Sequence, residues 1–134
     1  MNGSCIEPPE TGRAKISIIN GTFEKKDEDS DSDPFVKVYM DDKYLTKTKI
    51  IENQNDPEWK QSFVTPVITS DTQLGFIVLD KDQAGEELLL TVQTSVNLIL
   101  ALGLNGTATC DPPGSPKGFL CYSITWFPIT DFRI

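Results

Sequence analysis

The chain has 134 residues, 38% of them hydrophobic, which is enough for one domain with its own core but short for two. Twelve Lys and Arg residues against twenty Asp and Glu residues give a net charge of −8, and this excludes a general nucleic-acid binder, because phosphate backbones are bound by clustered basic side chains. The chain contains no histidine, which excludes His-based catalytic triads and most catalytic zinc sites.

The N-terminal segment has no hydrophobic period. Residues 1–14 are marked by Gly and Pro, and we expect a flexible lead-in to a single domain at residues 15–134. The segment lacks the charged start and apolar run of a signal peptide, and no stretch of the chain reaches the length of about 18 apolar residues that a membrane span needs. We therefore expect a cytoplasmic monomer, or a secreted protein if the chain is part of a larger precursor.

Short β-type segments alternate with polar loops along the rest of the chain. The candidate strands are residues 15–20, 35–40, 43–51, 58–67, 73–80, 88–95, 98–104 and 118–129. In the second of them, Val36, Val38 and Met40 fall on one face, the period-two pattern of a half-buried strand. Residues 86–104 also fit a helix, but their β-branched residues and their place in the series favour two strands. The sequence thus predicts an all-β fold, an eight-stranded antiparallel β-sandwich.

Two acidic runs lie where strands begin or end. The first places five carboxylates within residues 27–33, directly before the strand at 35–40, and the second follows the strand at 73–80. Like charges about 4 Å apart repel by roughly 1 kcal/mol even in water, so such runs favour a bound cation. Two loops at strand ends can meet at one tip of a sandwich, where Ca²⁺, with about six to eight oxygen ligands, fits better than Mg²⁺.

Two other interpretations of these runs remain. An EF-hand beginning at Asp27 is excluded, because Ser32 occupies the position of its glycine and Val38 the position of its bidentate glutamate. Both runs would otherwise be solvated loops without a ligand. The pairing of two runs at strand ends favours the cation site.

Three stretches resemble the C2 domain family. Residues 27–38, DEDSDSDPFVKV, resemble its first calcium loop and the D-P-Y/F-V-K-V strand start. Residues 46–63, TKTKIIENQNDPEWKQSF, resemble its Thr-rich strand and N-P-x-W-N-x-x-F signature, and residues 79–89, LDKDQAGEELL, resemble its third loop. The resemblance covers about residues 15–92 and implies a C2-like sandwich. The final strand at 118–129 favours the second (type II) of the two C2 topologies.

The resemblance also implies the ligands of the cation site. The implied Ca²⁺ ligands are Asp27, Asp33, Asp80, Asp82 and Glu87. The third loop is shorter than is usual in the family, and its last acidic ligand is either Glu86 or Glu87.

Three lysines form a second candidate site. Lys37, Lys47 and Lys49 resemble the lysine-rich groove with which some C2 domains bind phosphoinositide head groups, and the K-T-K spacing places the last two on one face. The more ordinary interpretation is that these lysines keep an exposed sheet face soluble.

The function that the resemblance implies is calcium-dependent, peripheral binding to anionic phospholipid membranes. We expect this binding to be shallow and sensitive to salt, because the third loop offers only Gln83, Ala84 and Gly85 at its tip. Catalysis is not expected, because paired carboxylates serve hydrolysis in a substrate-sized cleft rather than at an exposed tip.

Two alternatives stay open. The short third loop would suit a C2-type module that binds a protein partner without calcium. The glycosylation triplets that begin at Asn2, Asn20 and Asn105 would suit the membrane-attachment C2 part of a secreted pore-former resembling perforin. Cys110 and Cys121 could pair in an oxidising compartment, but for a cytoplasmic chain we expect two reduced thiols.

Overall fold

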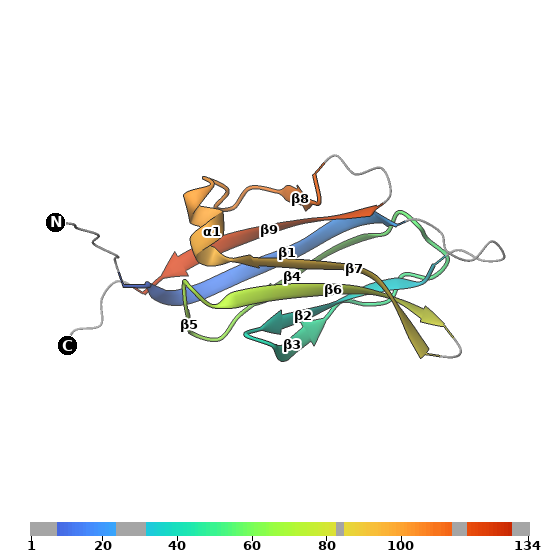
Figure 1. Cartoon of the computed structure of the whole chain (residues 1–134), viewed down its shortest axis with the longest axis horizontal. Helices are drawn as coiled ribbons and strands as arrows, with labels where there is room; N and C mark the ends of the chain where they lie inside the picture. Colours follow the sequence, from blue (N-terminus) through green and yellow to red (C-terminus); the bar gives the residue numbers. More distant parts are fainter. Residues whose placement is uncertain (1–7, 24–31, 83–84, 114–117, 130–134) are drawn as a thin grey trace.

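The period-two alternation of the sequence is realised in two antiparallel β-sheets that pack face to face (Figure 1). The structure, a computed structural model, describes residues 8–23, 32–82, 85–113 and 118–129. Its elements are β1 (Thr11–Phe23), β2 (Pro34–Met40), β3 (Lys43–Lys47), β4 (Glu58–Val64), β5 (Ile68–Thr69), β6 (Gln73–Asp82), β7 (Gly85–Ser95), α1 (Val96–Ala101), β8 (Thr109–Asp111) and β9 (Gly118–Pro128).

The two sheets have simple strand orders. The first sheet has the order β4-β1-β9-β8, with β5 also paired to β1, and the second has the order β3-β2-β6-β7. Every ladder between named strands is antiparallel. The predicted all-β sandwich of two antiparallel sheets is therefore confirmed.

The core lies between the two sheets and follows the alternation. Val36 and Val38 of β2 are fully buried, as predicted, and Ile16 of β1 is buried on the facing sheet. The rings of Phe76 and Tyr122 meet edge to face across the core, with centroids 5.0 Å apart. Each such buried side chain contributes roughly 1.5–3 kcal/mol to folding, so the sandwich is a rigid support for the loops at its ends.

The strand predicted at residues 98–104 is wrong. The described residues form nine strands and one short helix, and α1 occupies residues 96–101. The Ser95 side chain caps this helix by accepting a hydrogen bond from the Leu98 N–H, and Val96 and Ile99 bury one face at helical spacing. Local capping thus overrides the apolar run. With six residues, α1 is too short to cross a bilayer, and no helix of the described part could do so.

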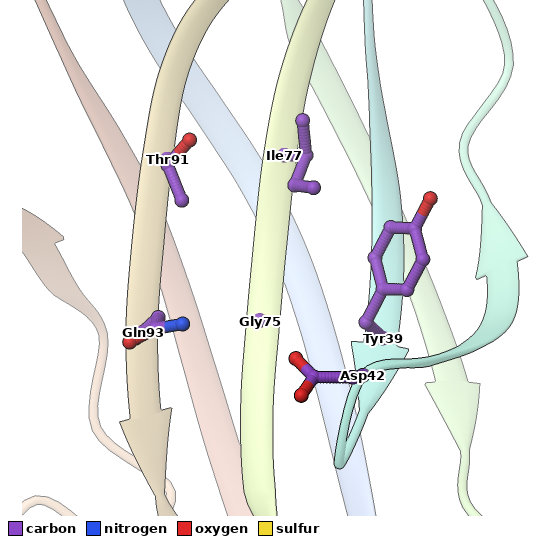
Figure 2. Close-up of a pocket in the computed structure, with 6 residues that line it drawn as sticks. All are labelled: Tyr39, Asp42, Gly75, Ile77, Thr91 and Gln93. Atoms are coloured by element: carbon purple, nitrogen blue, oxygen red, sulfur yellow. The ribbon is translucent and has the colours of Figure 1, made fainter.

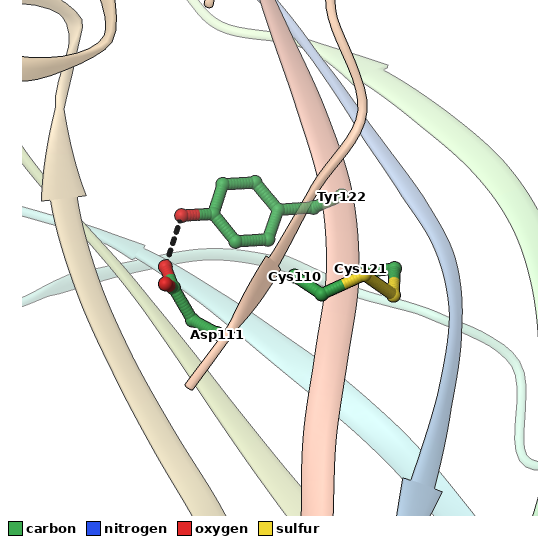
Figure 3. The surroundings of a disulfide bond; sticks show 4 residues. All are labelled: Cys110, Asp111, Cys121 and Tyr122. Atoms are coloured by element: carbon green, nitrogen blue, oxygen red, sulfur yellow. Dashed lines mark hydrogen bonds between the residues drawn. A yellow bond between two sulfur atoms is a disulfide. The ribbon is translucent and has the colours of Figure 1, made fainter. Parts of the chain in front are cut away.

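The expectation of two reduced thiols is also wrong. Cys110 of β8 and Cys121 of β9 lie directly opposite each other in the ladder and form a disulfide bond (Figure 3). Beside it, the Tyr122 hydroxyl donates a hydrogen bond to the Asp111 carboxylate. Burial, followed by this hydrogen bond, raises the pKa of Tyr122 well above its usual value. The short strand β8 is therefore attached to the sheet by a covalent bond and a buried polar contact.

Reduction of this disulfide is expected to lower the free energy of unfolding by about 3 kcal/mol, the usual effect of opening a loop of this length. Chemical denaturation with and without a thiol reductant measures the change. The double variant Cys110→Ser/Cys121→Ser is the control and should not respond to reductant, although it keeps Cys5. An equal response of the wild-type chain and the double variant would contradict the disulfide.

Candidate functional site

The two acidic runs of the sequence reach the same end of the sandwich. The end of β1, the start of β2 and the hairpin of β6 and β7 lie opposite the two termini (Figure 1). In the ladders, Asp80 of β6 lies between Pro34 of β2 and Glu87 of β7. Asp33 directly precedes Pro34, so it is brought beside Asp80 although the two are 47 residues apart in sequence.

Backbone amides hold the two central carboxylates. The Asp33 N–H donates to Asp80 Oδ1 at 2.8 Å, and the Asn53 N–H donates to Asp33 Oδ1 at 2.7 Å. The Lys81 N–H donates to the Asp33 carbonyl at 3.1 Å, which extends the contact between the two segments. One oxygen of each carboxylate is thus oriented by an amide, and such bonds favour the charged form of a carboxylate.

The connection between β3 and β4 also belongs to this end, and the sequence interpretation missed it. Asn55 Oδ1 accepts a hydrogen bond from the Ser32 N–H at 3.0 Å, and the Gln54 N–H donates to the Ser32 carbonyl at 2.8 Å. The only signal in the sequence is the polar run before Trp59, which the family resemblance assigned to packing. These residues fix the segment that leads into Asp33.

The remaining predicted ligands are placed in part. Asp82 pairs with Gly85 at the end of the hairpin, and Glu87 lies opposite Asp80. Asp27 lies outside the described residues. Within the described residues, no group of three or more His, Cys, Asp and Glu side chains lies close enough to hold a metal ion. Carboxylate oxygens are the donors that a hard cation such as Ca²⁺ prefers, so the residues present fit this ion, while the described part alone does not supply a full ligand set.

The three predicted lysines lie on the outer face of the second sheet. Lys37 and Lys47 are direct partners in the ladder of β2 and β3, and the Lys47 ammonium lies 5.9 Å from the centre of the Phe35 ring. Thr48 is buried between Lys47 and Lys49, which are both exposed, so the predicted alternation of this stretch is confirmed. The Thr48 hydroxyl accepts a hydrogen bond from the Val36 N–H at 2.9 Å and thereby holds the stretch against β2.

Lys37 is already paired with an acidic residue of the third loop. Its ammonium lies 3.1 Å from Glu86 Oε1, and the hydrogen bond to this carboxylate raises the pKa of Lys37 above its ordinary value of 10.5. Since Glu86 is turned toward this lysine, Glu87 is the better candidate for the last acidic ligand. The lysine face therefore carries less positive charge than the sequence alone indicates.

The sequence model of the C2 domain matches residues 12–109 of the chain. The chain belongs to the C2 domain family. Tricalbin-3 of Saccharomyces cerevisiae is 35% identical to this C2 domain over 79 residues, which are 58% of the chain and 5% of the relative. A protein of Arabidopsis thaliana named calcium-dependent lipid-binding protein is 30% identical over 100 residues, which are 73% of the chain and 20% of the relative.

A solved structure agrees with the fold of this C2 domain. A C2 domain of plant extended synaptotagmin 1 superposes with a TM-score of 0.72 over 93% of this chain and 100% of that domain, at 20% sequence identity. At this identity the likeness speaks for the fold alone. The C2 domain spans only a small part of the two curated relatives, so it matches one module of longer proteins.

The ion pair of Lys37 predicts a local change in titration. Glu86→Gln should lower the pKa of Lys37 toward 10.5, because the charged hydrogen-bond acceptor is lost. The pair raises the pKa of Lys37 in the folded state, so its stabilising effect is present below the ordinary pKa and is lost as the pH rises through the raised value. An NMR titration of the Lys37 side chain measures both values.

The matched control is Glu58→Gln, which removes the same charge from the exposed ion pair with Lys60 on β4, where the nitrogen and oxygen are 3.2 Å apart. This control should leave Lys37 unchanged. Identical titration of Lys37 in the two variants would show that the contact with Glu86 does not form in solution.

Proposed function

We propose that this C2 domain binds Ca²⁺ at its acidic end and, once loaded, attaches peripherally to membranes that contain anionic phospholipids. The observation that carries the proposal is the hydrogen bond from the Asp33 N–H to the Asp80 carboxylate, which unites the two acidic runs. The name of the Arabidopsis relative, calcium-dependent lipid-binding protein, supports the same function. The role is non-enzymatic, and we propose a monomer that acts at the cytoplasmic face of a membrane.

The ion would be held by Asp33, Asp80, Asp82 and Glu87, together with Asp27 from outside the described residues. When bound, Ca²⁺ offsets the carboxylates and offers positive charge to phosphate oxygens. Without it, these residues repel an anionic surface, and the backbone amides at Asp33 and Asp80 keep the carboxylates in place. The switch is therefore electrostatic and requires little change of shape. The position of β9 beside β1 supports the type II topology.

We propose a second contact with the head group through Lys37, Lys47 and Lys49. The pairing of Lys37 with Lys47 and the exposure of Lys49 support it, because the three ammonium groups share one face of the second sheet. Glu86 competes with an anionic head group for Lys37. Binding at this face then depends mainly on Lys47 and Lys49.

A secreted C2 part of a perforin-like pore-former is the second candidate function, because the Cys110–Cys121 disulfide is typical of oxidising compartments. In that case, the same acidic end would face an outer leaflet. The membrane contact itself would be unchanged.

Removal of one central carboxylate tests the calcium site. Wild-type protein freed of metal should bind Ca²⁺ with a dissociation constant of roughly 10⁻⁷ to 10⁻³ M in a calorimetric titration, and Asp80→Asn should weaken binding about tenfold or more, because a charged ligand is lost. Asp71→Asn is the control, since Asp71 is exposed in the turn before β6, away from the acidic loops. No heat and no thermal stabilisation by millimolar Ca²⁺ would contradict the proposal and favour a calcium-independent protein-binding module.

Charge reversal tests the lysine face. Lys47→Glu/Lys49→Glu should abolish calcium-dependent binding to vesicles of phosphatidylcholine with phosphatidylinositol bisphosphate, whereas Lys60→Glu on the other sheet should bind as the wild type does. Molar salt should release the wild type, because screened charges hold it to the surface. Leu88→Ala should bind normally, although Leu88 is 52% exposed beside the acidic end. Binding that survives molar salt would mean that apolar insertion dominates.

A further inference from the structure

A hollow on the outer face of the second sheet is formed where β6 lacks a side chain. Gly75 of β6 lies in the ladders between Tyr39 of β2 and Gln93 of β7. In the next row, Ile77 is the partner of Thr91 and forms an apolar wall. These residues line a cavity of about 240 Å³ that is open to solvent (Figure 2). The hollow is part of neither the acidic end nor the lysine face.

A carboxylate is placed over this hollow by an unusual turn. β2 and β3 are joined by two residues in the left-handed region, Asp41 with φ 48° and Asp42 with φ 67°. Such turns ordinarily use Asn-Gly, and each non-glycine residue in this region costs roughly 1 kcal/mol or more. Asp41 anchors the turn, because its N–H donates to the Gln73 carbonyl at 2.8 Å and its Oδ1 accepts from the Gln73 N–H at 2.9 Å. Asp42 is thereby directed toward Gly75 (Figure 2).

The polar groups around the hollow are not used by the fold. Among the residues that the structure describes, the side chains of Asp42, Thr91 and Gln93 and the Tyr39 hydroxyl form no hydrogen bond or ion pair, and they line one small concavity. The Tyr39 ring is held by an edge-to-face contact with Tyr44, with centroids 5.8 Å apart. A carboxylate, an amide oxygen, two hydroxyls and an aromatic face together suit a cation with an apolar stem.

We propose that this hollow binds a lysine or arginine side chain of a protein partner. Complementary charge supports a basic partner, since the chain carries a net charge of −8 and Asp42 lies at the rim of the hollow. A protein is favoured over a lipid by position. Gly75 is five residues before Asp80 on β6, which at about 3.3 Å per residue places it roughly 17 Å from the acidic end. This argument of position rests on the proposed membrane contact, because a tip bound to a bilayer turns the hollow away from the lipid.

The test uses soluble probes without calcium or membranes, so its outcome is independent of the proposed function. In an NMR titration of the full chain, Nα-acetyl-lysine methylamide or Nα-acetyl-arginine methylamide should shift the amide signals of Gly75 and Gln93 saturably. The neutral probe Nα-acetyl-norleucine methylamide should not. Asp42→Asn should weaken binding about fivefold, the factor that corresponds to one contact between unit charges in water.

Two further variants make the test specific. Gly75→Ala should abolish the shifts by filling the hollow, and it should fold, because the nearest atom to the added methyl group is Tyr39 Cβ at an ordinary 3.8 Å. Asp56→Asn removes the same charge at an exposed position after β3 and should bind as the wild type does.

Three results would overturn the proposal. Equal affinity of the Asp42→Asn and Asp56→Asn variants would show that the cation is not bound in the hollow, and equal binding of the norleucine probe would show that charge is not recognised. Calcium-free binding to phosphatidylcholine vesicles that Gly75→Ala abolishes would assign the hollow to a lipid head group instead.

Discussion

The pairing of β2 with β6 is the constraint on which the rest of the molecule depends. Its register places Pro34 opposite Asp80, Lys37 opposite Ile77 and Tyr39 opposite Gly75. The first row forms the acidic end, the second carries a predicted lipid contact, and the third forms the hollow. A slip of one residue would turn Val36 and Val38 out of the core, so burial of these two side chains fixes all three features together.

The structure tolerates its concentrated negative charge by giving individual acidic groups local partners. Asp33 and Asp80 accept backbone N–H groups, Asp41 accepts the Gln73 N–H, and Glu86 is paired with Lys37. These bonds orient the carboxylates, which avoids part of the entropy cost when a ligand arrives. Asp42 differs from them, because its carboxylate has no such partner among the described residues.

The sequence predicted the sandwich and the meeting of the acidic runs, but not the details of the α1 segment and β8. The alternation of Val36 and Val38 is a local signal that tertiary contacts reinforce. The run at 98–104 carried no clear period, and the Ser95 cap decided for a helix. Cys110 and Cys121 were visible in the sequence, whereas their pairing depends on the register of β8 against β9, which spacing alone does not give.

What the sequence by itself determined is the fold class, the position of the acidic runs at strand ends and the family to which the chain belongs. These properties are written in local periodicity and in short motifs, so they survive without a structure. Only the tertiary structure decided that Glu86 turns to Lys37, that the segment of Asn53 and Asn55 supports Asp33, and that Gly75 opens a hollow beneath Asp42. Each of these contacts joins residues on separate strands or loops, and its geometry follows from the register and twist of the sheets, which no single segment encodes.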